Sequence, residues 1–177
     1  MRNMQANMRR FNLFLALMAM TLLCGCQVLE SLGLAHYKQT GALRVHMESA
    51  ATADTSQTIS VLRANPVLIT ISKEPFLTEA DIVSAKVVDT PGGFAIQIHF
   101  DENGGWLLEQ YTANNPGMHL AIFGQWGDKL ANGRWLAVPL ITHRIAGGVL
   151  TFTPDMSRAE ADQLVLGLND FAKHSSQ

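Results

Sequence analysis

The chain has 177 residues, a formal net charge of −2 at pH 7 and charged side chains at 16% of its positions. A mildly acidic chain without a basic cluster lacks the electrostatic surface that nucleic-acid binding requires, so we predict no nucleic-acid partner. The sequence has neither internal repeats nor low-complexity blocks, and it has only two cysteines, too few for a disulfide framework.

The first 25 residues have the three parts of a bacterial export signal. Arg2, Arg9 and Arg10 form a basic head without an acid, and the apolar run Phe11–Leu23 follows it. This run is shorter than the about 20 apolar residues that a transmembrane helix needs. An uncut anchor helix is the alternative. Small residues then precede Cys26, as they do at a cleavage site.

The residues before Cys26, Leu23-Cys24-Gly25, resemble the lipobox of bacterial lipoproteins. The resemblance implies cleavage between Gly25 and Cys26, a diacylglycerol on the Cys26 thiol and acylation of its new amino group. Two or three acyl chains, at about 0.8 kcal/mol per buried methylene, exceed the single chain that binds a membrane reversibly. We therefore expect residues 1–25 to be a signal peptide and Cys26 to tether the mature chain permanently to a membrane.

The spacing of the two cysteines disfavours both a disulfide and a metal site. A disulfide between Cys24 and Cys26 would be badly strained, and a metal site would need further ligands that the neighbouring sequence lacks. Gln27 stands where an Asp would favour retention in the inner membrane. By the rule known for enteric bacteria, we expect attachment to the outer rather than the inner membrane, with the domain facing the periplasm. Loss of the signal removes three Arg and takes the formal charge to −5.

We assign residues 26–42 to a lipidated tether and residues 43–177 to a single domain, long enough to bury a core. Leu43, Val45 and Met47 alternate with polar residues, which is typical of a half-buried strand. Small polar residues predict a loop at 49–58, and apolar residues predict strands at 59–62 and 67–72.

The middle of the domain alternates between strands and helices. Thr78, three residues before Asp81, predicts the cap of a short helix. Ala85–Val88 and the alternating segment Phe94–Phe100 flank a Pro-Gly-Gly turn and predict a hairpin. A helix is predicted at Gly105–Ala113, preceded by Asp101 and Glu102, whose charges favour a helix N-terminus. We expect it to bury Leu107, Leu108, Tyr111 and, at its start, Trp106.

The last third predicts more strands and one long helix. Strands are expected at residues 118–122, 136–140 and 149–153. Ser157 and Glu160 form a capping box, and apolar residues follow at helical spacing, so a helix is predicted from Arg158 to Ala172. We therefore predict an α+β fold: a mostly antiparallel sheet with two main helices on one face and the other face partly open to solvent or a partner.

From Glu79 to Leu168, the order of residues resembles the first periplasmic domain of SecD, a membrane subunit of the bacterial protein-export machinery. The resemblance implies the ferredoxin-like arrangement of the SecD head and a noncatalytic module that engages polypeptide. The matching positions are Thr78–Ile82, Ala85, the Gly-Gly turn and strand ending at Phe100, Gly105, Leu108, Thr112, Gly117, Leu120–Phe123, Pro139, Ile145, Gly147, Gly148, Ser157, Glu160, Ala161, Leu164 and Leu168.

Two departures limit the resemblance. The membrane segments through which SecD couples a proton gradient to export have no counterpart in this sequence, so we expect no gradient-driven work. The short hairpin turn of SecD is here the longer segment Gly124–Trp135, so its role cannot be carried over.

That segment contains the candidate partner-binding site. Trp126 and Trp135 flank it, and Lys129 and Arg134 lie between them. Tryptophan is enriched at recognition hot spots, and Trp with cations also suits a lipid headgroup layer. The alternative is that both indoles fold back over the sheet and cover the core.

The sequence contains no catalytic motif. The six histidines lack metal-ligand spacing, and no nucleophile or phosphate-loop motif is present. His46 and His99 could meet on the open sheet face, beside Arg44, Glu48 and Gln97, but we favour a solvated face over a metal or acid–base site there. We predict no enzyme activity, metal, cofactor or small-molecule substrate.

Together these features predict a membrane-anchored envelope lipoprotein whose SecD-like domain binds a polypeptide partner, such as an envelope or export protein. Two alternatives come from other classes. One is a structural lipoprotein that oligomerises to scaffold the cell envelope, and the other is a ligand or metal site on the open sheet face.

Overall fold

The computed structural model describes residues 39–50 and 54–175. The predicted signal peptide, its cleavage site at Gly25 and Cys26 lie outside these residues, as does most of the predicted tether at 26–42. Within the described ranges, no helix is both long and apolar enough to cross a membrane.

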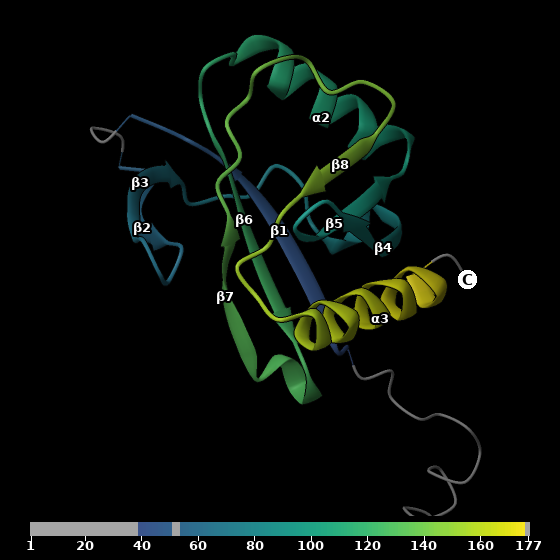
Figure 1. The fold of residues 1–177 in the computed structure, drawn as a ribbon. Coiled ribbons are helices and arrows are strands. Elements are labelled where there is room, and N and C mark those ends of the chain that lie inside the picture. Colours follow the sequence, from purple (N-terminus) through teal and green to yellow (C-terminus); the bar gives the residue numbers. More distant parts are fainter. Residues whose placement is uncertain (1–38, 51–53, 176–177) are drawn as a thin grey trace, which may run out of the picture. The chain divides into compact units, whose positions relative to one another are not determined.

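The described residues form an α+β fold in which every strand pair is antiparallel, as predicted. The strands form three small sheets, ordered β1–β6–β7, β2–β3 and β4–β5–β8 (Figure 1). The strands are β1 (Gly41–Met47), β2 (Ser56–Val61), β3 (Val67–Ser72), β4 (Ile82–Thr90), β5 (Gly93–Phe100), β6 (Leu120–Trp126), β7 (Asn132–Ala137) and β8 (Val149–Phe152). The helices are α2 (Glu102–Asn114), α3 (Arg158–Ser175) and the short 3-10 helices η1 (Glu79–Asp81) and η2 (Asp128–Leu130).

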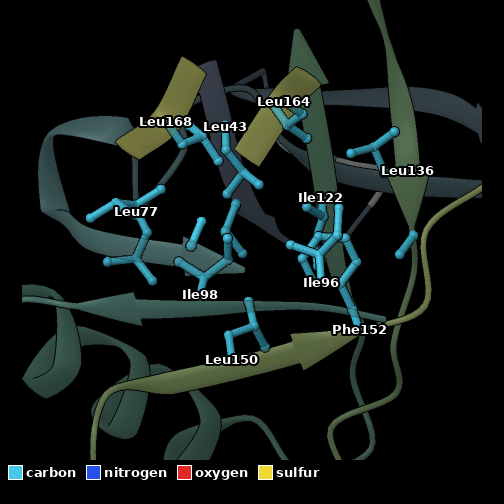
Figure 2. Close-up of a cluster of buried hydrophobic side chains, with 14 of the residues drawn as sticks. Leu43, Leu77, Ile96, Ile98, Ile122, Leu136, Leu150, Phe152, Leu164 and Leu168 are labelled. Atoms are coloured by element: carbon cyan, nitrogen blue, oxygen red, sulfur yellow. The ribbon is translucent and has the colours of Figure 1, made fainter. Parts of the chain in front are cut away.

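The main core lies between α3 and the sheets β1–β6–β7 and β4–β5–β8. Leu164 and Leu168 of α3 are buried against side chains of β1 and β5, and Leu150 and Phe152 of β8 join the same cluster (Figure 2). Burial of such a side chain stabilises the fold by about 1.5–3 kcal/mol, so this cluster holds the two sheets and the helix together.

Two local features of the sequence fix the start and the packing of α3. The predicted capping box is confirmed, since the Ser157 amide donates to Glu160 Oε2 at 2.8 Å and the Glu160 amide donates to Ser157 Oγ at 3.3 Å. Farther along, Gly167 packs directly on the backbone of Gly41. A Cβ at Gly167 would lie 2.4 Å from the Gly41 nitrogen, so only glycine allows this approach of α3 to β1.

A second, smaller core lies on the other face of β1–β6–β7. Successive side chains of a strand point to opposite faces. Leu120 and Ile122 therefore enter the main core, whereas Ala121 between them contacts the β2–β3 hairpin. The face predicted to be partly open is more covered than expected, because the hairpin places four buried side chains on it: Ile59, Val61, Ile69 and Ile71.

Two local predictions are corrected by the structure. Trp106, which follows the first turn of α2, is 58% exposed rather than part of the core, whereas Leu108 of the same helix is buried. Tyr111 is 36% exposed and stacks on Phe76 at the surface. The predicted short helix capped by Thr78 is confirmed: it is a single 3-10 turn with a capping box, and it is short because β4 begins at Ile82.

Candidate functional site

The four residues predicted to bind a partner do not form one surface. β6 continues to Trp126 and β7 begins at Asn132, so only residues 127–131 form the turn between them. Trp126 is 3% exposed and belongs to the main core. Trp135 is half-buried on the opposite face, and Lys129 is exposed at the turn. The alternative, in which the indoles pack over the sheet and cover the core, thus describes Trp126. A partner-binding role for the four residues stays a prediction.

Arg134 packs over the ring of Trp126. Its guanidinium lies 4.9 Å from the centre of the Trp126 ring, and its Nη2 donates to Glu160 Oε1 of α3. A cation over an indole face is attracted by the negative face of the ring. The pair therefore fastens the β6–β7 hairpin to α3.

Trp135 forms the floor of a cleft under the β2–β3 hairpin, which we call the hairpin cleft. Its ring lies 5.1 Å from the ring of Phe123 and 5.2 Å from that of His46, centre to centre. The cleft has a volume of about 330 Å³. Its lining residues are Ser60, Leu62, Arg63, Pro66, Phe123, Gly133, Arg134, Trp135 and Asp155.

An ion pair fastens one side of the hairpin cleft. The Arg63 amide donates to Asp155 Oδ2 at 2.8 Å, and Arg63 Nη2 lies 3.2 Å from Asp155 Oδ1. The hydrogen bonds from Arg63 hold the pKa of the Asp155 carboxyl below its usual value. Leu62, next to this pair, has a φ of 68°, a left-handed conformation that leucine rarely adopts. The hairpin is thus held in place at a strained position.

A second depression lies beside β8, and we call it the β8 groove. It has a volume of about 280 Å³ and runs between β8 and residues 139–145. Leu140 on its rim is 51% exposed. The lining contains no Asp, Glu, Lys or Arg and consists of Leu120, Pro139, Leu140, Ile141, Thr142, His143, Ile145, Val149, Leu150 and Thr151.

The wall of the β8 groove opposite β8 is held at several points. The Ile141 amide donates to the Met118 carbonyl at 2.8 Å, and the Ile141 carbonyl accepts from the Gly117 amide at 2.9 Å. The Ile145 amide donates at 2.9 Å to the hydroxyl of Thr112, which is buried in α2. The groove is therefore formed in the free protein rather than waiting for a ligand to shape it.

The histidine pair proposed from the sequence does not form. His46 and His99 lie on β1 and β5, which belong to different sheets, so that expectation is wrong. His46 is 5% exposed, and its Nδ1 lies 2.9 Å from the Ser72 carbonyl. Burial lowers the pKa of His46, although the hydrogen bond to Ser72 opposes the shift. Among the described residues, no cluster of three or more His, Cys, Asp or Glu could hold a metal ion.

A third depression, of about 350 Å³, lies at the start of α2 beside the exposed Trp106. Asp101 borders it, but its Oδ1 accepts from the Gly104 amide at 2.7 Å, as a helix N-cap does. The prediction that acids at 101 and 102 serve the helix N-terminus is thus confirmed for Asp101, and its carboxylate is already used by the helix.

No sequence pattern marks the β8 groove. The alternation at residues 136–140 predicts a regular strand through Leu140, and β8 is only four residues long. The groove exists because β8 pairs with β5, whereas the segment at 139–145 bonds instead to the residues around Met118. This difference in pairing keeps the two segments apart. Only the two glycines before β8 mark the place where the chain turns into it.

Comparison with known proteins places this geometry in a family. The sequence model of the SecDF P1 head subdomain matches residues 52–172. A structure of SecDF, a membrane component that enhances protein export, aligns with a TM-score of 0.52 and 19% identity, over 75% of this chain and 64% of that chain. A crystal structure of SecDF in a super-membrane-facing form aligns with a TM-score of 0.52 and 20% identity, over 75% of this chain and 19% of that chain. The chain thus matches less than two thirds of either SecDF chain. No curated protein matches its sequence.

Proposed function

Since this chain belongs to the SecDF P1 head subdomain family, we propose that it is a noncatalytic, membrane-anchored envelope lipoprotein whose head domain binds polypeptide in an export-related process. SecDF itself is a membrane component that enhances protein export. The present chain would bring a head domain to the membrane on a lipid anchor in place of SecDF's own membrane part.

The observation that carries the binding role is the β8 groove. Its lining combines aliphatic side chains with Thr142, His143 and Thr151 and contains no Asp, Glu, Lys or Arg. The exposed Leu140 lies on its rim. Burial of an apolar side chain against such a lining releases water from both surfaces and is favourable by about 25 cal/mol per Å². Unfolded polypeptides expose apolar side chains that folded proteins bury, so the groove would favour an unfolded segment over a folded surface.

The anchoring role rests on Cys26 and on the signal that precedes it. Lipidation at Cys26 would fix the domain to the outer membrane and keep it in the periplasm. Only residues 27–40 would separate the anchor at Cys26 from β1, which begins at Gly41. The groove would then sample polypeptide close to a membrane surface.

The binding role is tested by photo-crosslinking from the full chain in lipid vesicles. A photoreactive residue replaces Leu140, and in the matched control it replaces Val83, which is 59% exposed on β4. The probe is a secretory protein kept unfolded by reduction and carboxymethylation, and its native form is the comparison. We expect crosslinks from position 140 to the unfolded probe alone. Equal crosslinking from both positions, or none from either, would contradict the proposal.

The anchor is tested separately with Cys26→Ala. This variant should lose acyl labelling and membrane association, because it lacks the thiol at the predicted lipidation position. Mass spectrometry of the wild-type protein should find a lipidated N-terminus at Cys26. A Cys26→Ala chain that stays on the membrane would contradict lipid anchoring at Cys26 but would not bear on the proposed polypeptide binding.

A further inference from the structure

Several strand edges of the described structure are closed by the chain itself. The Asn169 side chain donates to the Ala85 carbonyl and accepts from the Ala85 amide, which closes the edge of β4. The Val45 amide donates to the Leu77 carbonyl at the edge of β1, and the Asp155 amide donates to the Leu136 carbonyl at the edge of β7. Such closure prevents other chains from pairing with these strands.

The outer edge of β8 is different. Antiparallel strands alternate between hydrogen-bonded and non-bonded pairs. The Phe100 amide donates to the Gly148 carbonyl at 2.9 Å, so the next bonded pair is Ile98 with Leu150. The backbone groups of Val149 and Thr151 therefore point away from β5. Within residues 39–50 and 54–175, no hydrogen bond to these outward groups is found.

These open backbone groups border the same groove as the apolar wall at 139–145. We propose that the β8 groove binds an extended polypeptide by strand addition: the segment pairs with Val149 and Thr151 and places an apolar side chain against Leu140. This inference deepens the proposed function and rests on it. In strand addition, main-chain hydrogen bonds supply affinity, and pockets for alternate side chains supply specificity.

The groove fits an extended, unfolded segment better than a second copy of this chain. Residues 139–143 form a wall across from β8. The sheet edge of a folded copy would meet that wall, whereas a single extended chain can lie along the groove. The lining carries no charge that would select a charged ligand, and the open amides and carbonyls require a partner with both donors and acceptors. A peptide backbone has both.

The edge of β2 offers an internal comparison. The Lys73 amide donates to the Thr55 carbonyl, so by the same alternation the backbone groups of Ser60 point outward beside the hairpin cleft. That cleft is lined by Arg63, Arg134 and Asp155. An apolar chain placed there would desolvate ion-paired groups, which is unfavourable. We therefore place the peptide at β8 and not at β2.

The first test uses a synthetic peptide and the full chain in vesicles. The probe is a dye-labelled heptapeptide, Lys-Thr-Leu-Thr-Leu-Thr-Lys, and its partner has the same sequence with N-methyl groups on both leucines and the central threonine. Methylation removes backbone donors and leaves the side chains in place. We expect the unmethylated peptide to bind at least about tenfold more tightly, since each hydrogen bond is worth a factor of about 2 to 10. Equal affinities would overturn strand addition but leave polypeptide binding standing. If neither peptide binds and the unfolded protein probe does not crosslink, the proposed function fails as well.

The second test uses the protein. Thr151→Pro removes an outward amide without removing a backbone bond to β5, and Thr151→Ala keeps the amide. Both variants lose the side-chain bond from Gln97 Nε2 to Thr151 Oγ1 at 3.3 Å, so they differ in the amide. Ser60→Pro makes the equivalent change at β2. We expect about tenfold weaker peptide binding for Thr151→Pro alone. A loss with Ser60→Pro instead would move the site to the hairpin cleft and overturn the proposal. Thermal unfolding of each variant verifies its fold. If Thr151→Pro is unfolded, the methylated peptide decides the question by itself.

A third measurement addresses self-association. Light scattering of the full chain in detergent, with and without a tenfold excess of the peptide, should give the same monomeric protein mass. A dimer that the peptide dissociates would show that a second copy occupies the edge of β8, and this would overturn the assignment of the groove to an unfolded segment.

Discussion

The hairpin cleft and the β8 groove are depressions of similar volume, but they are built differently. The hairpin cleft has an aromatic floor of Phe123 and Trp135, and the Arg63–Asp155 ion pair closes one side of it. The β8 groove has mainly aliphatic walls and no Asp, Glu, Lys or Arg in its lining, and both depressions border a strand edge whose outward backbone groups have no hydrogen bond among the described residues. The conspicuous aromatic residues thus contribute mainly to packing, while the β8 groove combines free hydrogen-bonding groups with a lining that holds no ion pair. Aromatic side chains in a sequence therefore need not mark the surface that binds.

The largest expected effect is a loss of stability when an aromatic residue of the core is removed. Trp126→Ala should lower the free energy of unfolding by about 3–5 kcal/mol, because it leaves a cavity in the main core and removes the ring under Arg134. Chemical denaturation measures this change in the free energy of unfolding. The control Trp106→Ala, at an exposed position, should change stability by less than about 0.5 kcal/mol. Similar small changes in both variants would mean that Trp126 is not a core residue.

Thr112→Val tests whether the wall of the β8 groove depends on one hydroxyl. Valine keeps the shape of the side chain but leaves the Ile145 amide without its acceptor. We expect a loss of about 1–3 kcal/mol in the free energy of unfolding, together with weaker binding of the leucine-threonine peptide. Thr142→Val, on the exposed rim, serves as the control and should leave stability unchanged. If peptide binding survives Thr112→Val intact, the wall does not shape the site.

Lowering the pH should reduce the free energy of unfolding through His46, which lies next to the β2–β3 hairpin. Burial places the folded-state pKa of His46 below its unfolded value of 6.5, so the unfolded chain takes up the proton first. The stability contribution is therefore full above pH 6.5 and is lost as the pH falls below that value. His46→Gln, which can still donate to the Ser72 carbonyl, should show a flatter fall in unfolding free energy between pH 7.5 and 5. The hydrogen bond to Ser72 opposes the effect of burial, so we expect a smaller change than for Thr112→Val. Parallel pH profiles would exclude His46 as the source.

The smallest effect is expected at the ion pair of the hairpin cleft. Arg63→Ala removes an exposed guanidinium but keeps the backbone bond from residue 63 to Asp155. We expect only a small loss of stability, reduced further by salt, because the guanidinium is solvent-exposed. Peptide affinity at the β8 groove should not change. A marked fall in that affinity would mean that the two depressions are coupled and would remove the distinction between them.

Elements defined by local signals are predictable. The capping box at Ser157 sets the start of α3, and alternation sets β3 and the β4–β5 hairpin, because these signals act over a few residues. The prediction misplaces Trp106 because its hydrophobicity says nothing about which side of α2 meets the sheets. It misses the covered face of β1–β6–β7 for a related reason: alternation shows that a strand has two faces but not what lies on each.

The candidate site follows the same division. The chain alone contains the order of the elements, the series of residues shared with the SecDF head, the Trp-flanked segment and the lipobox-like residues before Cys26, from which lipidation stays a prediction. Three further facts depend on the folded domain: Trp126 is buried, His46 and His99 lie on different sheets, and the outer edge of β8 has no hydrogen-bonded neighbour in the part of the chain that the structure describes. Caps and alternation depend on neighbours in the chain, so a sequence contains them in full. Burial and unpaired strand edges depend instead on which distant segments meet, and the packing of the whole domain sets these contacts.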